Sequence, residues 1–141
     1  MSDAFWAFGS SFKMGDGGTP EYFTPVSEVI DMSTAFSRSS IEVTNQGSTQ
    51  GWTEFVSGFR DGGVLTVQMN WLPNDATHDE TTGLWEQFID NENHNYQIIL
   101  PDALATIAFT GHITGFPPSL PVKDVAKVAV AIKISGPVVI T

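Results

Sequence analysis

The chain has 141 residues, 41% of them apolar, which is enough to bury one sizeable core in a single domain. It contains no cysteine, so neither a disulfide framework nor a thiolate metal site is available. Sixteen acidic and six basic residues give a formal charge of −10, the opposite of the balance that attracts nucleic-acid phosphates. We find no apolar run of the roughly 18 residues that a membrane span needs, and no secretory signal, so we expect a protein made in the cytoplasm.

Alternation of apolar and polar residues with a period of two predicts a mostly β chain. In chain order, the expected strands are Phe5–Lys13, Val26–Ser37, Ser39–Thr44, Glu54–Phe59, Val64–Trp71, Tyr96–Leu100, Thr106–Thr114 and Val125–Ser135. The last is the clearest, because its alternate residues from Val128 to Ile134 are all branched and apolar. In the second, the residues expected to share the apolar face are Val26, Ile30, Met32 and Phe36.

Gly and Pro residues place the turns between these strands. Asp61-Gly62-Gly63 predicts a tight hairpin turn, since glycine adopts the positive φ angles that such turns need. Pro101-Asp102 predicts a second hairpin, which runs from Tyr96 to Thr114. The proline-rich stretch Gly115–Pro121 cannot donate a regular ladder of hydrogen bonds and is expected to be a loop.

One segment has helical rather than β periodicity. Thr77 and Glu80 match a capping box, and apolar residues recur at helical spacing from Leu84 to Ile89. The run Asp90–Asn93 should end this helix, which predicts about three turns over residues 78–90. We therefore expect a mainly-β fold, a β-sandwich or one strongly curved sheet, with one flanking α-helix and extended loops.

Motifs for catalysis or metal binding are absent from the sequence. His78, His94 and His112 are far apart and are expected to be surface or sheet-face residues. No Gly-x-Ser-x-Gly elbow surrounds Ser48, and the glycines at 15–18 lack the Lys-Ser/Thr of a phosphate-binding loop. We expect no catalytic residue, no metal site and no cofactor.

The polar segment Thr44–Thr53 is uncharged and contains nothing that could build a core by itself. Two interpretations stay open for it. One is a mobile hairpin loop at the surface. The other is a segment that becomes ordered against a partner, with Trp52 as its anchor.

The order of these elements resembles the tail tube proteins of long-tailed, lambda-like bacteriophages over nearly the whole chain. The stretches that carry the resemblance are Thr24–Thr44, Gly51–Trp71, Phe109–Phe116 and Val128–Gly136. Its most specific parts are Arg38–Thr44 and the W-x-x-F-x-x-G-x-x-D-x-G pattern from Trp52 to Gly63. The resemblance implies a β-sandwich flanked by a helix, six copies of which form a ring, with rings stacked into a hollow tube for DNA passage. It also implies a tape-measure protein, a tail-tip initiator and a tail terminator as partners, and a place in the virion tail.

This interpretation assigns roles to two groups of residues in one domain of residues 1–141. Contacts between subunits or rings are expected from an N-terminal arm, about residues 1–18, and from the polar loop, about residues 44–53. The contact candidates are Phe5, Trp6, Asn45, Gln46, Gly47, Ser48, Thr49, Gln50, Gly51 and Trp52. The lumen-lining candidates are Asp31, Ser33 and Glu42, with Thr66, Gln68 and Asn70 as a second set.

Two alternatives remain beside the tail tube. A tail terminator or a type VI secretion tube-like component would share the same assembly logic and differ in the length of the polymer. A ligand-binding or enzymatic β-sandwich would need His and carboxylate residues clustered in a pocket.

Overall fold

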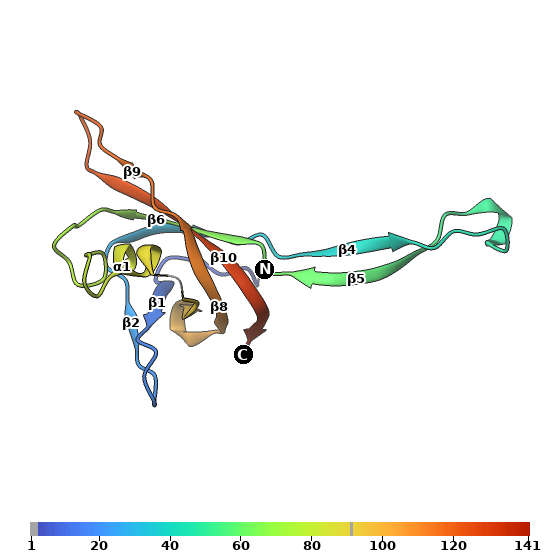
Figure 1. The fold of residues 1–141 in the computed structure, drawn as a ribbon, viewed down its shortest axis with the longest axis horizontal. Coiled ribbons are helices and arrows are strands. Elements are labelled where there is room, and N and C mark those ends of the chain that lie inside the picture. The colour runs from blue at the N-terminus through green and yellow to red at the C-terminus, as the bar shows by residue number, and fades with distance from the viewer. Residues whose placement is uncertain (1–2, 91) are drawn as a thin grey trace.

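A long β-hairpin projects from a body that is built on one antiparallel sheet (Figure 1). The structure is a computed structural model that describes residues 3–90 and 92–141. The elements are β1 (Ser11–Gly15), β2 (Phe23–Pro25), β3 (Val29–Ser33), β4 (Ser37–Glu42), η1 (Thr49–Gly51), β5 (Phe55–Asp61), β6 (Val64–Asn70), α1 (Leu84–Ile89), β7 (His94–Ile99), η2 (Pro101–Ala103), β8 (Thr106–Gly115), β9 (Pro118–Ser119) and β10 (Lys127–Ile140). They confirm the predicted mainly-β class with a flanking helix.

The eight-stranded sheet of the body curls so strongly that its two edges approach each other. Its strand order is β2-β1-β7-β8-β10-β6-β3, with β9 paired to β10. The outermost strands β2 and β3 are joined by residues 26–28 alone, which can span at most about 14 Å. At this link, Val26 donates its backbone N–H to the carbonyl of Phe12 in β1 at 2.8 Å. The two halves of the sheet therefore face each other around one core, as the layers of a β-sandwich do.

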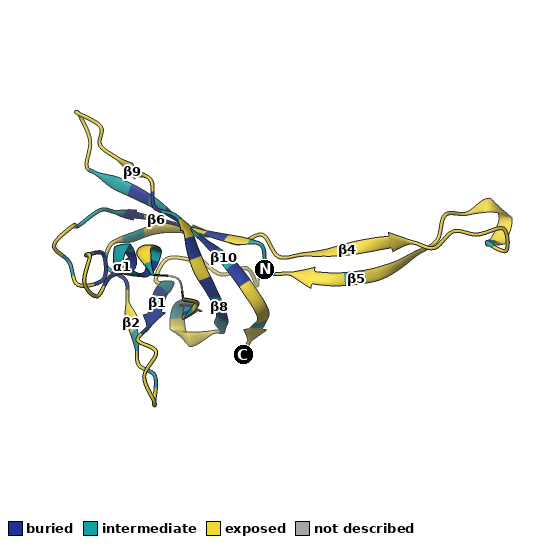
Figure 2. Ribbon diagram, viewed as in Figure 1, coloured by how far each residue is buried: buried dark blue, intermediate teal, exposed yellow. Residues whose placement is uncertain are grey.

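The core follows the predicted alternation along the central strands. Residues 128, 130, 132 and 134 of β10 and residues 65, 67 and 69 of β6 are buried, and the residues between them are more exposed. The two strands pair in antiparallel register, with Val130 opposite Val67 and Ile132 opposite Leu65. This alternation of buried and exposed positions is visible along β6 and β10 in Figure 2. Apolar residues on one face thus fix the register, since a one-residue slip would expose all of them.

The helix closes one side of the core and supplies a buried polar contact. Leu84 is fully buried, and Gln87 accepts a hydrogen bond of 2.7 Å from the hydroxyl of Tyr96. The Tyr96 ring is stacked between Phe12 and Phe109, with ring centroids 5.6 and 5.8 Å away. Burial raises the pKa of Tyr96. This tyrosine therefore keeps its proton, which it donates within the core.

The helix is shorter than predicted, because the capping box between Thr77 and Glu80 does not form. The Thr77 hydroxyl instead donates to the Asp75 carboxylate at 2.6 Å. The Asp79 carboxylate accepts the backbone N–H of Thr82 at 2.8 Å. These local bonds wind residues 75–82 into tight turns, as Asp and Thr side chains often do. The helix begins only at Leu84, so the predicted start near residue 78 is wrong. The predicted stop signal covers residues 90–93, of which residue 91 lies outside the described residues.

The β4–β5 hairpin forms a separate two-stranded arm, and the predicted hairpin turn at Asp61–Gly63 is wrong. β5 pairs with β4, whereas β6 pairs with β3 and β10 in the body. The glycines therefore carry the chain from one sheet into the other. Gly63 has φ +70°, and a Cβ at this position would collide with the carbonyl of Ala35. The positive φ was correctly expected here, and the strand pairing was not.

The predicted strand Val26–Ser37 is interrupted. β3 covers only Val29–Ser33, and a register shift between Val29 and Asp31 marks a bulge opposite β6. This bulge turns Ile30 outward, where 52% of it is exposed, and Phe36 is 44% exposed on the link to the arm. The prediction that Ile30 and Phe36 share the core face is therefore wrong.

Three further predictions concern the ends of elements. The hairpin around Pro101-Asp102 is confirmed, since β7 and β8 pair antiparallel. The first strand begins at Ser11 rather than Phe5, because a turn at residues 7–10, with Gly9 at φ +98°, precedes it. The expected loop Gly115–Pro121 contains the short strand β9, which pairs with the edge of β10.

Candidate assembly surfaces

The polar loop Thr44–Thr53 lies at the tip of the arm, far from the body (Figure 1). The tip makes its own hydrogen bonds. The Ser48 hydroxyl donates to the Glu54 carboxylate at 2.9 Å, and Asn45 accepts the backbone N–H of Gly47 at 2.8 Å. Trp52 contributes nothing to a core, because 70% of it is exposed. An exposed tryptophan on a self-supported loop is a ready anchor for another surface.

The strands of the arm are as exposed as its tip (Figure 2). All residues of β4 are exposed, and so are all residues of β5 except Gly58. Val43, directly after β4, is large, apolar and exposed, and so are four residues on the strands themselves: Ile41, Phe55, Val56 and Phe59. An exposed hairpin with large apolar side chains and two unpaired edges is a site for pairing with another chain.

The N-terminal segment offers a second group of exposed aromatic residues. Of the predicted arm 1–18, residues 1 and 2 lie outside the described residues. Phe5 and Trp6 are largely exposed, and the Trp6 ring stacks on Phe8 with centroids 4.9 Å apart. This segment precedes β1 and covers little of the domain's own core, which leaves its rings free for contact.

The two predicted sets of lumen residues lie largely on one face of the sheet. Asp31 is the register partner of Gln68, and Ser33 is that of Thr66. All four side chains are exposed, while the residues next to them on β6 are buried. Asn70 continues this polar face, and Glu42 does not join it, because it lies on β4 in the arm.

The sequence pattern did not point to the base of the arm. Arg38 and Arg60, the only arginines of the chain, are register partners there, and both are exposed. Phe59 beside them is 91% exposed. The sequence could have drawn attention to the two arginines because no other arginine is present. Only the pairing of β4 with β5, however, brings them together.

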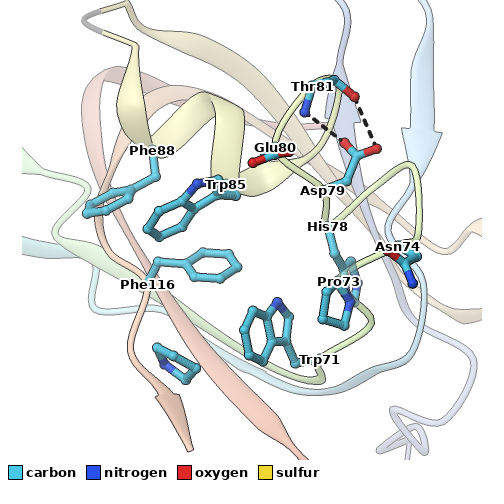
Figure 3. Close-up of a pocket in the computed structure, with 11 residues that line it drawn as sticks. Trp71, Pro73, Asn74, His78, Asp79, Glu80, Thr81, Trp85, Phe88 and Phe116 are labelled. Atoms are coloured by element: carbon cyan, nitrogen blue, oxygen red, sulfur yellow. Dashed lines mark hydrogen bonds between the residues drawn. The ribbon is translucent and has the colours of Figure 1, made fainter.

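A hollow of about 690 Å³ lies beside α1, and Trp and Phe rings form part of its wall (Figure 3). Trp85 and Phe116 pack edge to face, with centroids 5.3 Å apart. The lining residues are Trp71, Pro73, Asn74, His78, Asp79, Glu80, Thr81, Trp85, Phe88, Phe116 and Pro118.

Most polar side chains that line this hollow already form hydrogen bonds within the domain. His78 is buried, which corrects the expectation of a surface or sheet-face residue. Its Nδ1 accepts the backbone N–H of Leu72 at 3.0 Å, and its Nε2 donates to the carbonyl of Ser27 at 2.9 Å. Asp79 is held by the backbone N–H of Thr82, which lowers the pKa of its carboxyl group. The ring of His78 thus has no free nitrogen to act as a base.

Neither a metal-binding cluster nor a membrane-spanning helix lies in residues 3–90 and 92–141. No group of three or more His, Asp or Glu residues there could hold a metal ion. In the same part of the chain, no helix is long and apolar enough to span a membrane.

Together, a mainly-β body, an exposed two-stranded arm and unburied aromatic residues are typical of a structural subunit that contacts other chains. The family model "Lambda phage tail tube protein, TTP" matches residues 6–141. The chain belongs to this family of tail tube proteins, and it is a structural component of a virion tail. A comparison with curated protein sequences found no match.

Chains with the same fold occur in solved structures of a virion, a tail and an injection system. One chain of the virion of a native gene transfer agent has a TM-score of 0.78 and 20% identity, covering 98% of this chain and 99% of that one. A chain in the tail of an empty gene transfer agent particle, refined with C6 symmetry, has a TM-score of 0.76 and 21% identity. The match covers 93% of this chain and 94% of that one. A chain in the sheath/tube terminator structure of an extracellular contractile injection system has a TM-score of 0.70 and 16% identity, with 100% and 99% covered. At these identities the likeness shows a shared fold.

Proposed function

We propose that six copies of this chain form a ring and that these rings stack into the hollow tube of a phage tail, through which DNA passes. The membership in a tail tube family over residues 6–141 carries this proposal. The C6 symmetry of a structural neighbour supports the number of subunits. The protein acts by assembly and has no catalytic role.

The arm is the part of the chain that most needs neighbours. In one copy its apolar residues remain in water and both of its edges are unpaired within the described residues. Pairing with adjacent subunits would cover both, because each strand edge can extend a sheet. We assign the arm tip, residues 45–52, and the aromatic rings of Phe5 and Trp6 to contacts between subunits or between rings.

The polar face of β3 and β6 is suited to line the channel. Its members Asp31, Ser33, Thr66, Gln68 and Asn70 are neutral or acidic. Six copies with a formal charge of −10 each give a ring of −60. A lining that carries part of this charge would repel DNA phosphates, so DNA would slide through without adhering.

The partners follow from the same role. A tape-measure protein would fill the growing tube, a tip complex would start it, and a terminator would end it. A terminator-like role for this chain is the second candidate, because the sheath/tube terminator structure shares its fold at a TM-score of 0.70. Polymer length separates the two, since a tube protein forms long stacks and a terminator forms one ring.

Deletion of residues 45–51 tests the role of the arm tip. We expect a folded protein that no longer stacks, because these residues contribute nothing to the core. Far-UV circular dichroism checks the fold, and negative-stain electron microscopy checks the stacking. A second variant replaces the same residues with a Gly-Ser segment of equal length. It removes the side chains but keeps the length of the arm, so it separates these two effects of the deletion. Unchanged tubes in both variants would contradict the assignment of the tip.

A further inference from the structure

The base of the arm carries an unusual cluster of positive charge. Arg38 and Arg60 lie directly opposite each other in the β4–β5 ladder, so their side chains leave the same face of the arm. They hold two of the six positive charges in a chain of formal charge −10. Like charges in directly opposed positions destabilise a strand pair unless an anion lies between them.

Neither arginine finds that anion within its own subunit. Arg38 donates through Nε to the carbonyl of Gly58 at 3.3 Å, and neither residue has an ion pair among the described residues. The nearest acid in sequence, Asp61, is bound to Lys133 at 3.4 Å. The positive charge of both guanidinium groups is therefore available to another molecule.

The two arginines border a groove with an apolar floor. The groove has a volume of about 810 Å³ and lies between the arm base and β10. Phe36 and Phe59 expose their rings beside it, and Val138 and Ile140 of β10 line it. A surface of this kind fits a partner that presents carboxylates around an apolar centre.

The chain itself contains such a surface around α1. Residues 75–92 hold six of its sixteen acids and no Lys or Arg: Asp75, Asp79, Glu80, Glu86, Asp90 and Glu92. The carboxylates of Glu80, Glu86 and Glu92 have no hydrogen bond or ion pair with any residue that the structure describes. Ile89, which lies between Glu86 and Glu92 in the sequence, is 62% exposed. We call residues 75–90 together with Glu92 the acidic lobe.

The arm base and the acidic lobe lie on opposite sides of the body, with α1 on one side and the arm leaving from the other (Figure 1). They cannot meet within one subunit. We infer that the arm base of one subunit binds the acidic lobe of a second copy through Arg38 and Arg60. Such a contact joins two different surfaces, which is the kind that propagates into rings or filaments. This inference rests on the proposed self-assembly and names the charges that direct it.

A second copy is a better occupant than DNA for this site. The arm base is the only place among the described residues where two cations without acidic partners are adjacent. Around it, the chain carries a large excess of negative charge that repels phosphates. The acidic lobe, in contrast, brings free carboxylates together with an exposed apolar residue.

Charge exchange between two variants tests the contact. The arm variant carries Arg38→Glu and Arg60→Glu, and the lobe variant carries Glu80→Lys, Glu86→Lys and Glu92→Lys. Each variant by itself opposes like charges, so we expect its association to be at least about tenfold weaker than that of the wild type. In an equimolar mixture, the Glu arm meets the Lys lobe and the Arg arm meets the Glu lobe. Association should therefore return in the mixture only.

Sedimentation velocity measures this association without requiring tubes. A control with Lys13→Glu and Lys123→Glu has the same formal charge of −14 as the arm variant, four units below −10, but leaves the arm base intact. We expect this control to associate as the wild type does. Circular dichroism and thermal unfolding confirm that all variants remain folded.

Two results would overturn the inference. The first is wild-type association by both variants alone, and the second is a mixture that associates no better than its components. A gel-shift assay with duplex DNA tests the alternative that the two arginines bind DNA. If the wild type binds DNA and only the arm variant loses this binding, the arginines bind phosphates rather than the acidic lobe. A mixture that forms complexes but never tubes would leave this contact standing and count against the proposed tube.

Discussion

At the scale of single residues, the buried side chain of His78 connects two segments of the fold. It links the turn segment after β6 to the short connection between β2 and β3, through Leu72 and Ser27. Thr77 strengthens the same junction, because its hydroxyl accepts the backbone N–H of Ser27 at 3.1 Å. This junction lies where the two edges of the curled sheet approach each other.

Replacing His78 with Ala should destabilise the fold by about 2–3 kcal/mol, because two partly buried backbone groups lose their partners and a cavity forms. Urea unfolding followed by tryptophan fluorescence measures the change. Thr81→Ala on the same segment is the control, since Thr81 is exposed and should change stability by less than about 0.5 kcal/mol. Equal stability of the His78 variant and the wild type would show that the junction is dispensable.

The residues of the candidate surfaces could be predicted from the sequence only in part. The uncharged loop with Trp52 stands out by composition, and its position between two strand patterns suggests a hairpin tip. The arginine pair does not stand out, because Arg38 and Arg60 are 22 positions apart and meet only through the register of β4 and β5. His78 was misjudged because its partners Leu72 and Ser27 depend on how the sheet curls.

At the scale of elements, β10, with 14 residues, is a long inner strand of the body sheet. It pairs with β6 on one side and with β8 on the other, and its inward residues fill the middle of the core. Ile132 is fully buried opposite Leu65. No polar partner for a charged group faces this position from β6 or β8, where the register partners are apolar.

Ile132→Asp should therefore abolish the fold, because a carboxylate would be buried without a partner at a cost of several kcal/mol, about as much as such a domain's whole stability. Loss of the native far-UV spectrum and of soluble expression checks this prediction. Ala131→Asp is the matched control, since the neighbouring position faces outward and should tolerate the charge. A native spectrum for the Ile132 variant would overturn the assigned strand register.

Element types followed from local patterns more reliably than element pairing did. Alternation identified β6 and β10, because one buried face fixes the polarity of every second residue. The Asp61–Gly63 turn misled the prediction, because glycine permits the turn but does not determine which strands pair. The capping box failed because Asp75 accepts both the hydroxyl and the backbone N–H of Thr77, the groups that the box would have used.

At the scale of the whole molecule, the chain is divided into a body that folds on its own core and an arm that has none. The body buries apolar residues of β1, β6, β7, β8, β10 and α1 in one core, whereas the arm leaves almost every residue in water. A two-stranded hairpin is only marginally stable by itself. The arm is therefore understood most simply as half of a structure that a neighbouring subunit completes.

Electron microscopy of the purified protein, concentrated and followed over time, is the most direct test of this division. We expect hollow tubes of stacked rings with six-fold symmetry in end-on views, with the arms buried between subunits. Protein that stays monomeric in the microscope and in sedimentation, even when seeded with tail-tip complexes of the same virus, would contradict the assembly of this chain into a tube.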